Sequence, residues 1–167
     1  GTLYVAESQS AGRGRRGRRW ESPAGESIYM SLLLRPEFPP VKAPMLTLVM
    51  ALAVARALRE QTGVDVQIKW PNDLVVQGRK ICGILTEMSI EMTWINYVVI
   101  GIGINLSKKD NLLTKADYVS LPKEELLQKI LIQYDQLMMA KSSFLLSSIS
   151  QYSYLSGRSI LLDGIIW

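Results

Sequence analysis

A β-hairpin is predicted by the segment Leu74-Val75-Val76-Gln77-Gly78-Arg79-Lys80-Ile81-Cys82-Gly83-Ile84-Leu85, in which two apolar runs flank a glycine. Glycine readily adopts the positive φ that tight hairpin turns require. We therefore expect strands at 74–77 and 80–88, joined around Gly78. Lys80 begins the second strand, where solvent is its expected neighbour. Strands joined by so short a turn run antiparallel.

A helix and another strand are predicted before this hairpin. Pro44 suits the first turn of a helix, apolar residues follow at helical spacing, and Gly63 is expected to end it. The strand that comes next alternates, so its apolar side chains should share one face while Lys69 points the other way. Those apolar residues are Val64, Val66, Ile68 and Trp70.

The remaining periodicities predict a mixed fold. Leu3–Ala6 is expected to be a short buried strand, and Ser27–Leu34 alternates like a half-buried one. An irregular stretch at 89–93 precedes a strand from Trp94 to Leu106. Further elements are expected as a loop at 111–121, helices at 123–139 and 144–155, and a strand at 159–162. This order predicts the α+β class, with helices packed on a largely antiparallel sheet.

Composition narrows the classes of function. The chain has 167 residues, 48% of them hydrophobic, which is enough for one domain with its own core. Five arginines between residues 12 and 19 account for the basic balance, because without them the formal charge of +4 becomes −1. A basic character confined to one loop counts against extended binding of duplex nucleic acid. We also expect no bilayer-spanning segment.

Two residue types are scarce. There is no histidine, which removes the commonest general base and most zinc sites, so any chemistry must depend on positioning and fixed positive charge. The single cysteine, Cys82, excludes an internal disulfide and fits a reducing compartment such as the cytoplasm. Its simplest interpretation is a small core residue.

The arginines belong to Gly12-Arg13-Gly14-Arg15-Arg16-Gly17-Arg18-Arg19, which Trp20 follows. Arginine forks match phosphate oxygens, and glycines let the backbone approach a ligand closely. The segment therefore favours a phosphate-binding loop with an aromatic ring beside it. A disordered RNA-binding segment has the same composition, but the predicted strands on both sides place this one inside a folded domain.

Three further groups could carry chemistry. Lys69 could place one ammonium on a substrate phosphate, although solvated strand lysines are common. Asn72 and Asp73 are ordinary turn residues whose oxygens could also hold Mg²⁺ or a ribose. Glycines in the interior of a strand indicate close approach of a ligand, a bulge or a packed helix. These glycines are Gly83, Gly101 and Gly103, and Asn105 follows on the last strand.

Four motifs together resemble biotin–protein ligases. They are Gln9-Ser10-Ala11-Gly12-Arg13-Gly14-Arg15-Arg16-Gly17-Arg18, Lys69-Trp70-Pro71-Asn72-Asp73-Leu74, Lys80-Ile81-Cys82-Gly83-Ile84-Leu85 and Gly101-Ile102-Gly103-Ile104-Asn105. They occur in the family's order and cover most of residues 1–106. The resemblance implies the biotin–lipoate ligase architecture, which is similar to that of class II aminoacyl-tRNA synthetases.

The resemblance also implies an enzyme. Biotin would react with ATP, accompanied by Mg²⁺, to give biotinyl-5'-AMP, and a lysine of a biotin carboxyl carrier protein would then accept the biotinyl group. Lys69 and Arg15 would be catalytic. Biotin would contact Gln9, Gly12, Arg13, Gly14, Arg15, Lys69, Gly83, Ile84, Gly101 and Gly103. The adenylate would contact Arg13, Arg15, Arg18, Trp20, Asn72 and Asn105. No metal-ligating residues are implied.

Departures from the family pattern set the expected boundaries. Residues 1–156 would be the catalytic domain without the strand–helix segment that normally precedes it, and 157–167 the first strand of a truncated SH3-like domain. An open sheet edge would then favour a homodimer. A nucleic-acid-binding module, a lipoate-using ligase and an inactive ligase fragment remain the alternatives. Specific nucleic acids and membranes are not expected partners.

Overall fold

The structure, a computed structural model, describes residues 1–25, 27–106, 122–157, 161–162 and 165–166. Six strands form one antiparallel sheet in the order β1-β2-β6-β5-β4-β3. The strands are β1 (Thr2–Ala6), β2 (Ser27–Leu34), β3 (Gln67–Lys69), β4 (Asp73–Val76), β5 (Arg79–Glu91) and β6 (Trp94–Asn105). The helices are α1 (Ala43–Thr62), α2 (Lys123–Met138) and α3 (Ser142–Tyr152), with 3₁₀ turns at Arg15–Gly17 (η1) and Pro40–Lys42 (η2). The predicted α+β class is confirmed.

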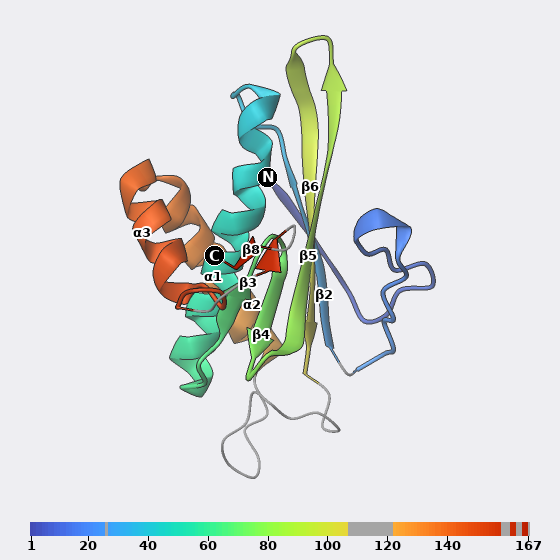
Figure 1. Cartoon of the computed structure of the whole chain (residues 1–167). Coiled ribbons are helices and arrows are strands. Elements are labelled where there is room, and N and C mark those ends of the chain that lie inside the picture. The colour runs from blue at the N-terminus through green and yellow to red at the C-terminus, as the bar shows by residue number, and fades with distance from the viewer. Residues whose placement is uncertain (26, 107–121, 158–160, 163–164, 167) are drawn as a thin grey trace.

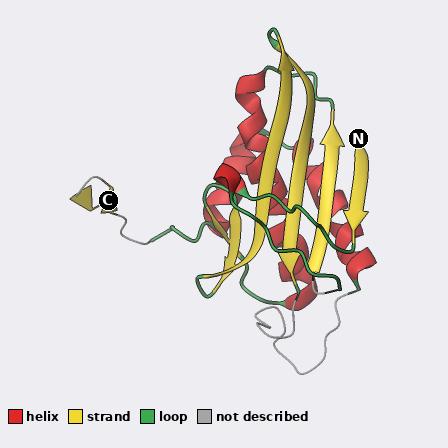
Figure 2. Cartoon of the chain, turned by 90° about the vertical axis from the view of Figure 1, so that its right-hand side faces the viewer, coloured by secondary structure: helices red, strands yellow, loops and turns green. Residues whose placement is uncertain are grey.

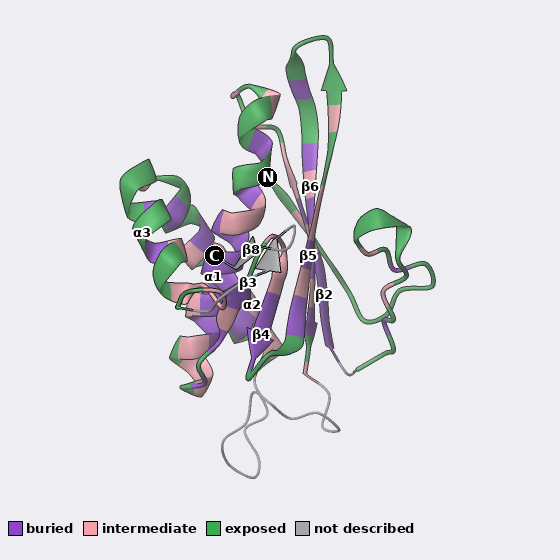
Figure 3. Cartoon of the chain, viewed as in Figure 1, coloured by how far each residue is buried: buried purple, intermediate pink, exposed green. Residues whose placement is uncertain are grey.

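The helices lie on one face of the sheet only. α1 packs directly on the strands, and α2 and α3 pack against α1 (Figure 1). The loop between β1 and β2 lies over the opposite face, which is seen from the front in Figure 2. The hydrophobic core lies between the sheet and the helices, where their buried residues meet (Figure 3). The face beneath the β1–β2 loop carries no helix and is therefore the one on which a site can lie.

The predicted hairpin between β4 and β5 is confirmed. Gln77 and Gly78 have φ values of 52° and 78°, the positive pair that a tight two-residue turn requires. β5 is longer than expected, because the segment at 89–91, predicted to be irregular, continues the strand after a register shift between Ser89 and Ile90.

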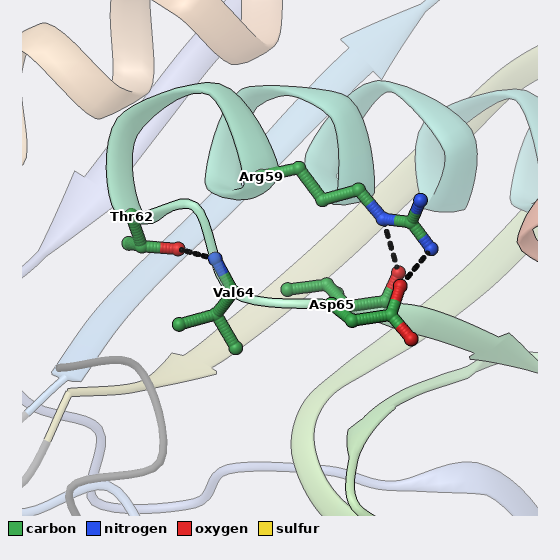
Figure 4. A network of polar contacts seen from close by, with 5 residues as sticks. Arg59, Thr62, Val64 and Asp65 are labelled. Carbon is green, nitrogen blue, oxygen red and sulfur yellow. Dashed lines mark hydrogen bonds and ion pairs between the residues drawn. The ribbon is translucent and has the colours of Figure 1, made fainter. Parts of the chain in front are cut away.

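The predicted end of α1 is confirmed as well. Gly63 has a φ of 63° and donates its N–H to the Arg59 carbonyl at 2.8 Å, a left-handed helix cap. Arg59 then contacts the strand that follows, donating to the Val66 carbonyl at 2.9 Å and pairing with Asp65 at 2.6 Å. Figure 4 shows this junction, with Thr62 accepting a hydrogen bond from the Val64 N–H. These contacts fix the direction in which the chain enters β3.

α1 departs from expectation in one respect. By length and composition alone the helix Pro40–Thr62, with a hydropathy of 1.7, could cross a membrane, whereas we expected no such segment. However, 61% of its most apolar window is buried inside the protein. It has the burial of a core helix, because it packs between the sheet and the outer helices.

Two burial predictions were wrong. β1 is an exposed edge strand, in which only Leu3 is partly buried, because a single neighbour, β2, covers it. Trp70 is 67% exposed and does not share the buried face of Val64, Val66 and Ile68.

The end of the chain forms a separate two-stranded sheet of β7 (Leu161–Leu162) and β8 (Ile165–Ile166). The strand predicted at 159–162 is confirmed for its last two residues, and its first two lie outside the described residues, as does the loop predicted at 111–121. The division at residue 156 stays a prediction.

Candidate functional site

A cavity of about 210 Å³ lies between the open face of the sheet and the β1–β2 loop. Its floor consists of two cross-strand rows that run over four strands. The lining residues of the rows are Ala6, Tyr29, Gly103 and Gly83 in one, and Tyr4, Ser31, Gly101 and Leu85 in the other. Because side chains alternate between faces, the isoleucines between the glycines point into the core.

The Gly/Arg segment forms the roof as a closed loop. The Gly14 N–H donates to the Arg18 carbonyl at 2.6 Å, and the Trp20 N–H donates to the Gly12 carbonyl at 2.9 Å. η1 lies between them, and Arg16 has a φ of 60° there. Gly12 itself is buried beneath the closure, where an added Cβ would overlap the Trp20 carbonyl oxygen. Its role is therefore to close the loop, because it does not line the cavity.

Two side-chain contacts help to hold this loop in place. Arg13 pairs with Glu87 of β5 at 2.8 Å, although both side chains are largely exposed and such pairs contribute only about 0–1 kcal/mol. Gln9 donates its amide to Ser22 Oγ at 2.8 Å, which joins the two ends of the loop. The loop is thus closed at its base, and the Arg13–Glu87 pair is one of its contacts with the sheet.

The side chain of Trp20 lies on the glycine floor and lines the cavity from there. A Cβ added at Gly83 or at Gly103 would approach atoms of the indole ring to 2.7 Å. Lys80 Nζ lies 5.0 Å from the ring centroid, within the range of a cation–π contact. The indole therefore rests directly on the backbone of β5 and β6.

Lys80 is exposed, as predicted, but it also makes contacts that the sequence did not predict. It lines the cavity, and its ammonium pairs with Asp73 Oδ1 at 2.8 Å. The cause is a bulge, since the register shifts between Leu74 and Val75 and leaves one extra residue in β5. A bulge of this kind moves the following side chain to the other face of a strand, so Lys80 joins Gly83 on the cavity side.

Lys69 faces the same side of the sheet but lies outside the cavity lining. In the strand register Lys69 lies opposite Asp73, and Asp73 lies opposite Gly83, so the three residues belong to one cross-strand row. Two strand spacings, about 10 Å, separate Lys69 from Gly83. Its ammonium lies 5.9 Å from the Tyr154 ring centroid. The predicted orientation away from the core holds, and contact with a ligand stays a prediction.

Asn72 joins the turn before β4 to the cavity floor. Its side-chain amide donates to the Ile84 carbonyl at 3.1 Å, and its own carbonyl accepts the Ile84 N–H at 2.9 Å. Asn105 lies at the end of β6, where it is exposed and pairs in register with Ser27. Asn72 therefore borders the cavity, whereas Asn105 lies beyond its lining.

The cavity gathers most of the predicted site residues and adds others. Its lining includes the predicted Gln9, Arg13, Gly14, Arg15, Trp20, Asn72, Gly83, Ile84, Gly101 and Gly103, but not Gly12, Arg18, Lys69 or Asn105. Sequence reasoning missed Tyr4, Tyr29, Ser31, Lys80, Leu85 and Glu87. Strand register was the missing signal, because most of these residues lie in the same cross-strand rows as the glycines.

Other chemistry has little support in the described part of the chain. No group of three or more histidine, cysteine, aspartate or glutamate side chains that could hold a metal ion occurs there. Cys82 is fully buried on the core side of β5, as predicted, and burial raises the pKa of its thiol well above the ordinary value. A thiol in that state is a poor nucleophile.

Comparisons with known proteins agree with this geometry. Residues 1–105 match the family model described as the biotin/lipoate A/B protein ligase family. The bifunctional ligase/repressor BirA of Bacillus subtilis is 50% identical over 111 residues, which are 66% of this chain and 34% of that protein. The biotin–[acetyl-CoA-carboxylase] ligase of Paracoccus denitrificans is 44% identical over 110 residues, 64% of this chain and 45% of that protein. The chain thus spans less than half the length of either relative.

A solved structure extends the similarity beyond the matched segment. The biotin protein ligase from Aquifex aeolicus in complex with biotin and ATP superposes with a TM-score of 0.79 at 31% identity, over 99% of this chain and 75% of that one. The architecture expected from the motifs is therefore confirmed.

Proposed function

This chain belongs to the biotin/lipoate A/B protein ligase family, and on that premise we propose that it is an ATP-dependent biotin–protein ligase. It activates biotin as biotinyl-5'-AMP and transfers the biotinyl group to a lysine of a biotin carboxyl carrier protein. The observation that carries the proposal is the cavity, in which a glycine floor and a roof of arginines enclose one space. A lipoate-using ligase is the second candidate within the same family.

The site residues supply charge and alignment for the first step. A carboxylate oxygen of biotin attacks the α-phosphorus of ATP, the bond to the bridging oxygen breaks, and pyrophosphate leaves. Negative charge grows on the phosphate oxygens, and fixed cations stabilise it most effectively where water is excluded. Arg13 and Arg15 of the loop line the cavity. Lys69 lies outside the lining, opposite Asp73 on the cavity side of the sheet. These three side chains are the proposed phosphate contacts.

The second step transfers the acyl group. The neutral amine of the carrier lysine attacks the carbonyl carbon of biotinyl-5'-AMP. The bond from that carbon to the phosphate oxygen breaks, AMP leaves with its electrons, and the amine loses a proton to water. The described residues hold no histidine, so alignment and charge have to achieve what a strong base does elsewhere. Mg²⁺ would arrive with the ATP phosphates, because it usually binds through phosphates and one or two carboxylates. Two carboxylates are near: Glu87 lines the cavity and pairs with Arg13, and Asp73 pairs with the cavity-lining Lys80.

One experiment tests the proposal on the chain as it stands. Exchange of labelled pyrophosphate into ATP should depend on biotin, and transfer should biotinylate an isolated carrier domain. Exchange supported by lipoate but not by biotin would favour the second candidate. Absence of exchange with both acids would contradict the ligase proposal and favour an inactive fragment. We also propose that the protein forms a homodimer, which analytical ultracentrifugation can check. Its proposed location is the cytoplasm, which cell fractionation can check.

Proteolysis should report closure of the roof. Five arginines within eight residues repel one another, and an anion between them relieves that repulsion. We therefore expect trypsin to cleave after Arg13 to Arg19 more slowly with biotin and MgATP than without. Cleavage at Lys141, distant in sequence from the loop, provides the internal reference. Equal protection at both places, or none at the loop, would contradict closure.

A further inference from the structure

Glu87 differs in charge from the other ionised residues of the cavity. Among the described residues that line the cavity, Arg13, Arg15 and Lys80 are cations. Glu87 is the one carboxylate in that lining, and it lies 2.8 Å from Arg13. A wall with three cations repels any further cation that enters. Glu87 is therefore the group of this wall that can attract one.

Glu87 lies at an end of the cavity that faces solvent, because its side chain is 44% exposed and that of Arg13 is 72% exposed. It follows Leu85 on the same face of β5 and lies opposite Val99 of β6, which also lines the cavity. Four residues of strand, about 13 Å, separate Glu87 from Gly83. A group that enters from solvent at this end therefore meets the Glu87 carboxylate before it reaches the glycine floor.

Arg13 has to change its partner during the proposed reaction. In the structure its guanidinium pairs with Glu87, whereas adenylate formation requires it at the α-phosphate. An exposed ion pair contributes little to stability, so this pair breaks readily when a phosphate group competes for the guanidinium. Once Arg13 has turned to the phosphate, the Glu87 carboxylate is available at the entrance of the cavity.

The second substrate of the proposed reaction is itself a cation. A lysine side chain has a pKa of about 10.4, so fewer than about one in a thousand is uncharged at pH 7. The carrier lysine therefore arrives as an ammonium ion, and it has to pass Arg13 and Arg15 to reach the acyl carbon. A carboxylate at the entrance would attract this ion and accept its charge-assisted hydrogen bonds.

We propose that Glu87 binds the ε-ammonium of the carrier lysine, and that Arg13 occupies this carboxylate until biotinyl-5'-AMP has formed. The adenylate draws Arg13 to its phosphate, and Glu87 then accepts hydrogen bonds from the ammonium. The ammonium gives one proton to water, and the neutral amine moves on to the acyl carbon, while no covalent bond of Glu87 changes. This exchange of partners makes binding of the carrier lysine follow adenylate formation. The inference rests on the proposed function.

Matched substitutions in β5 test the role of Glu87. Glu87→Gln keeps the shape of the side chain without its charge, and Glu91→Gln makes the same change at an exposed residue outside the cavity lining. Each variant is given isolated biotinyl-5'-AMP, and its rate of transfer to a carrier domain at low concentration is measured. Glu87→Gln should slow transfer about tenfold or more, the usual effect of losing hydrogen bonds to a charged group. Glu91→Gln should leave it unchanged, and Glu87→Asp, which keeps the charge, should recover most of the rate.

Two further measurements distinguish this role from a structural one. Hydroxylamine is an uncharged nucleophile at neutral pH, so Glu87→Gln should not slow its reaction with enzyme-bound biotinyl-5'-AMP. Biotin-dependent pyrophosphate exchange should not fall either, because Arg13 is then free for the phosphate. Unchanged transfer to lysine, or an equal loss in either of these two reactions, would overturn the proposal. Absence of exchange in the unmodified chain would contradict the proposed function, while transfer from supplied biotinyl-5'-AMP would still decide the role of Glu87.

Discussion

Replacing Lys69 by alanine is expected to lower the rate of adenylate formation by about 10² to 10³. A cation that acts only on charge developing in the transition state typically contributes about 3–4 kcal/mol. Lys69 is exposed and lies on the cavity side of the sheet, in one row with Asp73 and Gly83. Its present neighbour is the Tyr154 ring, so the ammonium has to turn toward the nucleotide. Biotin-dependent pyrophosphate exchange measures the effect.

The comparison for this prediction is Lys42→Ala. Lys42 is an exposed lysine of η2, before the helix that packs on the other face of the sheet. Lys80 is unsuitable because it lines the cavity. Both variants should unfold at the midpoint of the unmodified chain, since neither removes a buried side chain. A small and equal change in exchange for both would refute the role of Lys69.

Gly12→Ala is expected to reduce adenylate formation by about 10², the cost of misplacing a catalytic group by about 1 Å. The new methyl group would overlap the Trp20 carbonyl oxygen and lie 2.9 Å from Ser22 Oγ. Neither atom can withdraw without breaking the closure of the loop. The arginines of the roof would then lose their alignment, although no charged side chain is altered.

Gly14→Ala is the matched change within the same loop. Its methyl group would lie 3.2 Å from the Arg18 carbonyl oxygen, which a shift of a few tenths of an ångström relieves. We expect exchange to fall far less than in Gly12→Ala. Similar losses in both variants would show that the loop tolerates no side chain anywhere, and that closure at Gly12 has no special role.

The sequence predicted those parts of the fold that local chemistry determines. Gly63 and Gly78 adopt positive φ at the helix cap and the hairpin turn for reasons visible in the chain itself. Alternation likewise placed Gly101 and Gly103 on one face. The exposure of β1 was not predictable, because an apolar strand resembles a buried one until its neighbours are known. Two partners cover a central strand, but β1 has one.

The site was predictable in its residues but not in its arrangement. The motifs identified Trp20, Gly83 and Gly103, yet nothing local shows that the ring rests on the two glycines. The place of Lys80 beside the cavity was missed because a single extra residue in β5 changes the face on which it emerges. The register between strands determines both the seat of the indole and the side of the sheet on which Lys80 lies. The sequence pattern of a single strand gives no information on that register.

The strict alternation in β6 also limits how the length of this chain can change over evolution. Gly101 and Gly103 face the cavity, while Ile100, Ile102 and Ile104 face the helices. Inserting or deleting one residue within the strand would exchange the two sets, filling the cavity with isoleucine and emptying the core at once. Changes of length should therefore accumulate at the β5–β6 turn, and pairs of residues should be gained or lost more readily than single ones.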